Sequence, residues 1–206
     1  MKHKTIWITL FGLVVLFSSA IGIHITEEPV TPAEPEMTME IPEADEAFHK
    51  MMDVLEHQRC VNCHPSDNVP KQSDDRHPHH LGITRTNGTG SATNCQQCHA
   101  DSNNEYSGVP GAPHWALAPP SMAWEGLNRY EIARSMMDRS KNGNRSADDI
   151  MHHLTEHELV LWAWEPGVDS EGNPREIPPV GKEEYIEAVK TWIDAGAIIP
   201  DENTKD

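Results

Sequence analysis

The sequence is short of apolar and of basic residues. Only 37 % of its 206 residues are hydrophobic, and no long aliphatic run follows the first 25 residues. A core this poor in apolar side chains needs an additional group to fill it. Lys and Arg number 16 against 33 Asp and Glu, which leaves a net charge of −17. Such a chain would be repelled by nucleic-acid phosphates, so nucleic-acid binding is excluded, and the acidic surface suits either a basic partner protein or simple solubility.

The sequence also lacks alternating strand patterns and any internal repeat other than its cysteine pairs. Apolar residues recur instead at helical spacing in several segments. Helices are expected from about Asp45 into the first cysteine pair, from about Met122 to Met137, after the capping sequence 146–149, over 156–164 and over 182–194. Pro- and Gly-rich stretches separate these segments. The predicted fold is mainly α with long loops.

No cysteine lies near the N-terminus, which excludes a lipoprotein anchor. Residues 1–25 combine a basic start with an apolar stretch of the targeting type. Cleavage after Ala20 and retention of the stretch 6–25 as a membrane anchor are both open, and either delivers the rest of the chain to the periplasm. We therefore expect a periplasmic protein, secreted or anchored to the inner membrane by its N-terminal segment alone. The other expected segments are an acidic Pro-rich linker, a folded domain and a flexible tail, over 26–44, 45–200 and 201–206.

The four cysteines form two pairs, each followed directly by a histidine. The motifs are CVNCH at 60–64 and CQQCH at 95–99. Two thiols three residues apart on a helical turn reach the two vinyl groups of one haem, and the adjacent histidine then ligates the iron. Two haem c groups are therefore predicted. Their attachment residues are Cys60, Cys63, Cys95 and Cys98, and their proximal ligands are His64 and His99.

The cysteines alone would also suit two arrangements without haem. They are a zinc site built from both CxxC pairs, and a pair of disulfides in an oxidising compartment. Neither accounts for a histidine after each pair, so haem attachment is favoured. Because only thirty residues separate His64 from Cys95, we expect one compact cytochrome c-like domain wrapped around both haems rather than two tandem domains.

Each iron needs a sixth ligand if the protein only carries electrons, and His or Met can supply it. The candidate distal ligands, in order of preference, are His79, Met122 and His153, followed by His114. His153 is preferred to His152 because it shares a helix face with Ile150. The alternative for each is an exposed or merely packing side chain. Four tryptophans would pack on haem or form an ordinary core, namely Trp115, Trp124, Trp162 and Trp164.

From His77 to the C-terminus the sequence resembles a group of small dihaem cytochromes c. These are the electron-accepting subunits found beside periplasmic molybdenum hydroxylases, the isoquinoline 1-oxidoreductase subunit group. The segments that carry the resemblance are 77–79, 94–99, 114–124, 159–167 and 192–200. The CxxCH motif is its most specific part. The resemblance implies a partner that oxidises an aldehyde or N-heterocycle at molybdenum and passes electrons to these haems.

The function expected from the sequence is electron transfer, without catalytic residues of the protein's own. The protein would take electrons from a partner dehydrogenase and pass them to a downstream cytochrome or oxidase of the respiratory chain. Two other functions are open. One is a haem enzyme or sensor with one open iron site, of the peroxidase type, although dihaem peroxidases are longer chains. The other is a haem-bearing subunit that anchors a larger complex.

Overall fold

The computed structural model describes residues 41–85 and 95–202. The chain separates into two units, Met1–Met37 and Thr38–Asp206, and the described residues all belong to the second. The predicted targeting segment and most of the predicted linker and tail lie outside the described residues. In the ranges that are described, no helix combines the length and apolar character needed to cross a membrane.

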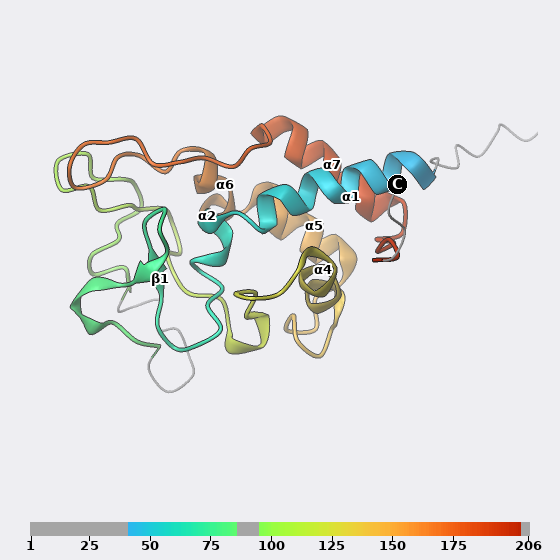
Figure 1. Cartoon of the computed structure of the whole chain (residues 1–206), viewed down its shortest axis with the longest axis horizontal. Helices are drawn as coiled ribbons and strands as arrows, with labels where there is room; N and C mark the ends of the chain where they lie inside the picture. Colours follow the sequence, from blue (N-terminus) through green and yellow to red (C-terminus); the bar gives the residue numbers. More distant parts are fainter. Residues whose placement is uncertain (1–40, 86–94, 203–206) are drawn as a thin grey trace, which may run out of the picture. The chain divides into compact units, whose positions relative to one another are not determined.

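The core is built on the contact between the first and last helices, α1 (Ile41–Leu55) and α7 (Lys182–Asp194). The two lie side by side in Figure 1, although they stand at opposite ends of the described chain. In α1 the buried Phe48, Met51 and Leu55 recur three to four residues apart and so share one face. Phe48 meets Trp192 of α7, with ring centres 6.1 Å apart. Because burial of each such side chain contributes about 2 kcal/mol, this helix pair supplies much of the stability of the domain.

Two capped helices complete the packed part of the domain, α4 (Arg129–Met137) and α5 (Ala147–Glu156). Asn128 and Ser146 are their N-caps, and each forms a capping box with the acidic residue three positions later. Ile150 and Leu154 of α5 are buried in the same core as α1 and α7. The opposite face of α5 is therefore the solvent side, and its orientation about its axis is fixed.

The remaining elements are short and are joined by loops. They are α2 (Gln58–Val61), α6 (Glu158–Leu161), the strands β1 (Lys71–Gln72) and β2 (His77–Pro78), and the 3₁₀ turns η1 (His80–Gly82), η3 (Pro120–Met122) and η4 (Trp162–Trp164). The two strands are antiparallel, with Lys71 opposite Pro78. Both CxxCH motifs lie among these short elements, so the candidate sites are held mainly by loops.

The mainly helical prediction is confirmed in its coarser form. Six α-helices and little sheet are found, and helices make up 42 % of the described residues. The last helix spans the predicted residues. The first begins at Ile41 rather than near Asp45, because Pro42 is tolerated in the first turn of a helix. The helix expected from Met122 begins only at Arg129, because Gly126 adopts a φ of +87° that interrupts it.

Candidate functional site

The first CxxCH motif, called the first site below, lies where α1 gives way to α2. The chain turns at His57, whose Nδ1 caps α2 by accepting a backbone N–H. The backbone N–H of Cys63 donates to the carbonyl of Cys60 at 3.1 Å, which continues the turn through the motif. Cys60, Cys63 and His64 therefore project from a single helical turn.

The ring of His64 is held by η3 and the residues around it. Its Nδ1 lies 2.7 Å from the carbonyl oxygen of Met122, and since a carbonyl only accepts, Nδ1 carries the proton. The ring stacks on Trp124, with centres 3.7 Å and planes 13° apart. The backbone N–H groups of Ala118 and Trp124 donate to the carbonyls of Cys63 and His64. Nε2 is left with the free lone pair, as in metal-ligating histidines whose other nitrogen donates to a backbone carbonyl.

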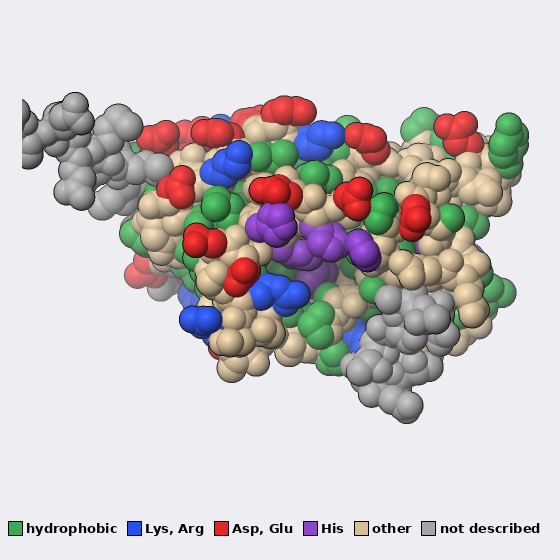
Figure 2. Space-filling view, turned by 180° about the vertical axis from the view of Figure 1, so that it is seen from behind, with side chains coloured by type: hydrophobic (Ala, Val, Ile, Leu, Met, Phe, Trp, Pro, Cys, Tyr) green, Lys and Arg blue, Asp and Glu red, His purple; other side chains and the backbone are tan. Residues whose placement is uncertain are grey.

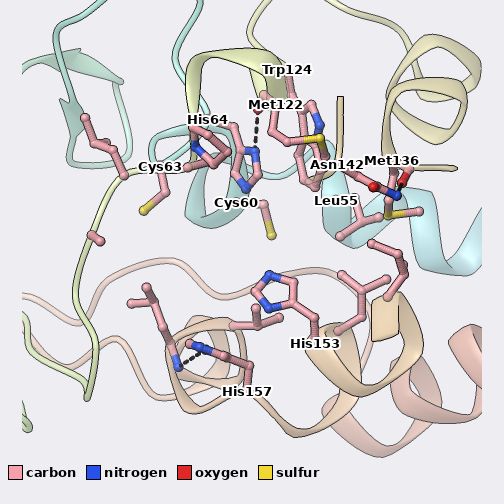
Figure 3. Close-up of a pocket in the computed structure, with 18 of the residues that line it drawn as sticks. Leu55, Cys60, Cys63, His64, Met122, Trp124, Met136, Asn142, His153 and His157 are labelled. Atoms are coloured by element: carbon pink, nitrogen blue, oxygen red, sulfur yellow. Dashed lines mark hydrogen bonds between the residues drawn. The ribbon is translucent and has the colours of Figure 1, made fainter. Parts of the chain in front are cut away.

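A cavity of about 260 Å³ lies beside His64 and the two thiols. Its wall is mostly apolar, with side chains that include Leu55, Met136, Ile150, Leu154 and Val160. Figure 3 shows His64 on one side and His153 of α5 pointing in from the opposite side, with the thiol of Cys60 between them. The ring of His153 forms no hydrogen bond with the described residues. The cavity therefore has a histidine on each of two facing walls.

Polar groups also line this cavity. The indole N–H of Trp124 is buried and has no acceptor within the described residues. The buried side chain of Arg59 forms an ion pair with Asp74 and donates to the carbonyl of Glu176 at 2.8 Å. Burial lowers the pKa of Arg59 to about 10, so the side chain stays cationic at neutral pH. An apolar cavity with an unpaired buried donor and a cation in its wall fits a flat apolar macrocycle that carries acidic substituents.

The second CxxCH motif, called the second site below, repeats the arrangement of the first with different partners. The backbone N–H groups of Cys98 and His99 both donate to the carbonyl of Cys95, at 3.1 and 2.9 Å. Nδ1 of His99 donates to the carbonyl of Pro110 at 2.7 Å. The ring of His99 stacks on Trp115, with centres 4.5 Å and planes 7° apart. Nε2 is again the nitrogen with a free lone pair.

Asn103 ties together the supports of His99. Its Oδ1 accepts the indole N–H of Trp162 at 2.8 Å and the backbone N–H of Gly111 at 3.0 Å. Trp162 packs edge-on against Trp115, with ring centres 4.9 Å apart. Gly111 directly follows the residue whose carbonyl holds His99. One side chain thus fixes both the stacking partner and the hydrogen-bond acceptor of this histidine.

His79 lies beside the second site. Its ring centre is 6.0 Å from that of His99, and the two planes are 75° apart. The backbone N–H of His79 donates to the carbonyl of Pro70 at 2.8 Å, and its Nδ1 donates to the carbonyl of His80 at 2.7 Å. The part of this loop that the structure describes, up to residue 85, therefore places the ring of His79 beside that of His99.

Burial sets the protonation of the residues in both sites. It raises the pKa of Cys60 to about 12 and of Cys63 to about 11, so both thiols are protonated at neutral pH. It lowers the pKa of His64 and of His153 to about 4. Burial also lowers the pKa of His99. These histidines are therefore neutral at pH 7, which is the form that binds a metal.

The two sites are neighbours in space. Trp115, which stacks on His99, directly precedes Ala116, which lines the cavity beside His64 and the first pair of thiols. No disulfide joins any of the four cysteines. Groups attached to the two pairs of thiols would lie close to each other.

Further histidines gather at the mouth of the first site, where Figure 2 shows them grouped on one face of the molecule. The ring centre of His157 lies 4.9 Å from that of His153 and 5.9 Å from that of His114. Nδ1 of His157 accepts a backbone N–H and caps α6. His152 is exposed and pairs with Glu156. Of the two adjacent histidines of α5, His153 is the one that faces the cavity.

The other predicted distal ligand, Met122, lies with His64 on one wall of the first site, because its own carbonyl binds the His64 ring. Its side chain is buried against the core. Sequence reasoning missed the carbonyls of Met122 and Pro110, since a backbone acceptor leaves no signal in residue type. It also missed Asn103, which sits in a stretch that reads as an ordinary polar loop.

Within the described ranges, no group of three or more His, Cys, Asp or Glu side chains is arranged to hold a bare metal ion. Comparison of the chain with protein-family models, with characterised proteins and with solved structures gives no match.

Proposed function

We propose that this chain is a periplasmic dihaem c-type cytochrome that transfers electrons. One haem would be held by Cys60, Cys63 and His64, and the other by Cys95, Cys98 and His99. Haem at these sites would supply reversible one-electron chemistry.

The observation that best supports the proposal is an arrangement of the histidine that occurs in both motifs. In both CxxCH motifs the histidine donates Nδ1–H to a backbone carbonyl at 2.7 Å and stacks on a tryptophan. This fixes the tautomer and the ring orientation and leaves Nε2 available to a metal. A zinc or disulfide role for the cysteines would give no reason for these histidines to be held in this way.

The surrounding residues have distinct tasks under this proposal. The thiols of each motif form the covalent attachments, and the apolar wall of the first site excludes water from the ring. Arg59 and the indole N–H of Trp124 are suited to the acidic substituents of the ring. Because the two sites are neighbours, an electron that enters at one can pass to the other.

The electron donor proposed here is a partner dehydrogenase, with a molybdenum hydroxylase suggested by the sequence resemblance. The net charge of −17 favours a partner with a basic docking surface. A downstream cytochrome or oxidase would accept the electrons. A mainly anchoring role in such a complex is the second candidate, and the predicted N-terminal segment favours it.

The test is a potentiometric titration of the full chain, produced with the haem maturation machinery and followed by visible absorption. Two reversible one-electron components are expected, and the reduced protein should pass its electrons to a basic soluble cytochrome c. The double variant Cys60→Ser/Cys63→Ser should keep one component. A protein that consumes hydrogen peroxide catalytically, or that shows no reversible component, would contradict the proposal.

A further inference from the structure

A second histidine lies near each CxxCH histidine, and at the second site the separation of the two rings can be compared with coordination chemistry. Two imidazoles that ligate one metal from opposite sides have ring centres about 6 Å apart, since each metal–nitrogen bond is about 2 Å long. The rings of His79 and His99 are 6.0 Å apart. Both donate Nδ1–H to a backbone carbonyl, so each keeps its Nε2 lone pair.

At the first site the second histidine is His153. It points into the cavity from the wall opposite His64 (Figure 3), and its ring forms no hydrogen bond with the described chain. The packing of α5 determines where His153 points. Ile150 lies three residues before His153 and Leu154 directly after it, and both are buried in the core. The capping box at Ser146 fixes where this helix begins.

Met122 is poorly placed to compete with His153. Its carbonyl binds Nδ1 of His64, so its backbone lies against the same ring and on the same wall of the cavity. A distal ligand has to reach the metal from the wall that faces His64. The side chain of Met122 packs in the core and also lines the cavity, but on the side of His64 rather than on that of His153 (Figure 3).

We propose that the two centres are both bis-histidine, with His64 and His153 on one iron and His99 and His79 on the other. The assignment rests on the proposed function, since it specifies how the two haem irons are held. It leaves neither iron an open position, so external ligands do not bind at neutral pH. It also implies lower reduction potentials than a methionine ligand would give.

The experiment is carbon monoxide binding by the dithionite-reduced full chain, together with near-infrared magnetic circular dichroism of the oxidised protein. The native protein should bind no carbon monoxide and should show bis-histidine ligation without a methionine signature. His153→Ala and His79→Ala should each open one haem to carbon monoxide, and added imidazole should close it again. His153→Met should shift one of the two potentials upward.

Two further histidines provide matched controls. His152→Ala, next to His153, and His49→Ala, on α1 and outside both sites, should leave both spectra unchanged. Carbon monoxide binding by the native protein, a methionine signature, or an open site in Met122→Leu but not in His153→Ala would overturn the assignment. If a variant fails to accumulate, the dichroism of the native protein decides by itself. A pyridine haemochrome assay, which counts covalent haems, separates the two proposals. If two covalent haems are present but the ligands differ, only the bis-histidine assignment is rejected. If no covalent haem is present, both proposals are rejected.

Discussion

The indole N–H of Trp162 donates to Oδ1 of Asn103 at 2.8 Å, across 59 residues of sequence. The same oxygen accepts the backbone N–H of Gly111. Two segments that are distant in the sequence are thus joined through the side chain of Asn103. The residues that hold His99 in the second site depend on these two hydrogen bonds.

Replacing Asn103 should therefore disturb the second site selectively. Asn103→Ala leaves two donors without their acceptor, and we expect the free energy of unfolding to fall by about 1–3 kcal/mol. Thermal or chemical unfolding measures the loss, and the absorption of the haem proposed for the second site should change while that of the haem proposed for the first does not. Ser102→Ala, an exposed neighbour, is the control. Equal changes at both haems would show that Asn103 acts on the whole fold instead.

The second site should also be sensitive to substitution of Gly111, because the backbone around this residue leaves no space for a side chain. A Cβ atom at this position would lie 2.3 Å from the carbonyl oxygen of Ser102 and 2.4 Å from that of Ala100. Gly111→Ala must therefore shift the backbone that carries the acceptor of His99. We expect the free energy of unfolding to fall by about 1–3 kcal/mol or more, the range typical of an overpacked site.

The readout for Gly111→Ala is carbon monoxide binding by the reduced protein, which should appear at the haem proposed for the second site because the acceptor of His99 is displaced. Gly181→Ala is the matched control, since a Cβ atom at Gly181 would meet no atom of the described chain within 4 Å. A Gly111→Ala protein that binds no carbon monoxide and keeps native stability would mean that the contact around Pro110 does not support the second site.

The capping box of α5 should give a pH-dependent contribution to stability. Hydrogen bonds from the backbone N–H and then the hydroxyl of Ser146 lower the pKa of Asp149 below its ordinary 3.8. The contribution is therefore fully present above pH 3.8 and is lost as the pH falls through the lowered value. At neutral pH, Ser146→Ala should lower the free energy of unfolding by about 1 kcal/mol.

The measurement is unfolding of native protein and Asp149→Ala between pH 6 and pH 2. The difference in the free energy of unfolding between the two proteins should be constant near pH 6 and should shrink toward pH 2. Asp148→Ala, in the same turn but outside the capping box, controls for general effects of charge on the helix. A difference that grows as the pH falls would contradict the assigned role of Asp149.

The helical part of this fold could be predicted from the sequence because its signals are local. The spacing of Tyr185, Val189 and Trp192 determined the last helix, and Ser146 with Asp149 marked the start of α5. The start of α1 could not be predicted as well, since Pro42 is compatible with both a linker and a first helical turn. The interruption before α4 depends on the backbone conformation of Gly126, which sequence periodicity does not report.

The candidate site was predictable in its motifs but not in its supports. CxxCH marks the cysteines and the adjacent histidines by spacing alone. The partners of His64 and His99 are backbone carbonyls, and every residue has one, so nothing in the sequence distinguishes Met122 or Pro110 in this role. The approach of the His79 ring to within 6.0 Å of the His99 ring likewise depends on tertiary contacts, which residue types do not report.

The most direct test of the central proposal is the intact mass of the mature protein, produced with the haem maturation machinery and denatured before measurement. The proposal predicts the polypeptide plus two haems, and the polypeptide plus one haem for either pair of Cys→Ser substitutions. A mass equal to that of the polypeptide alone, with four free thiols, would contradict it.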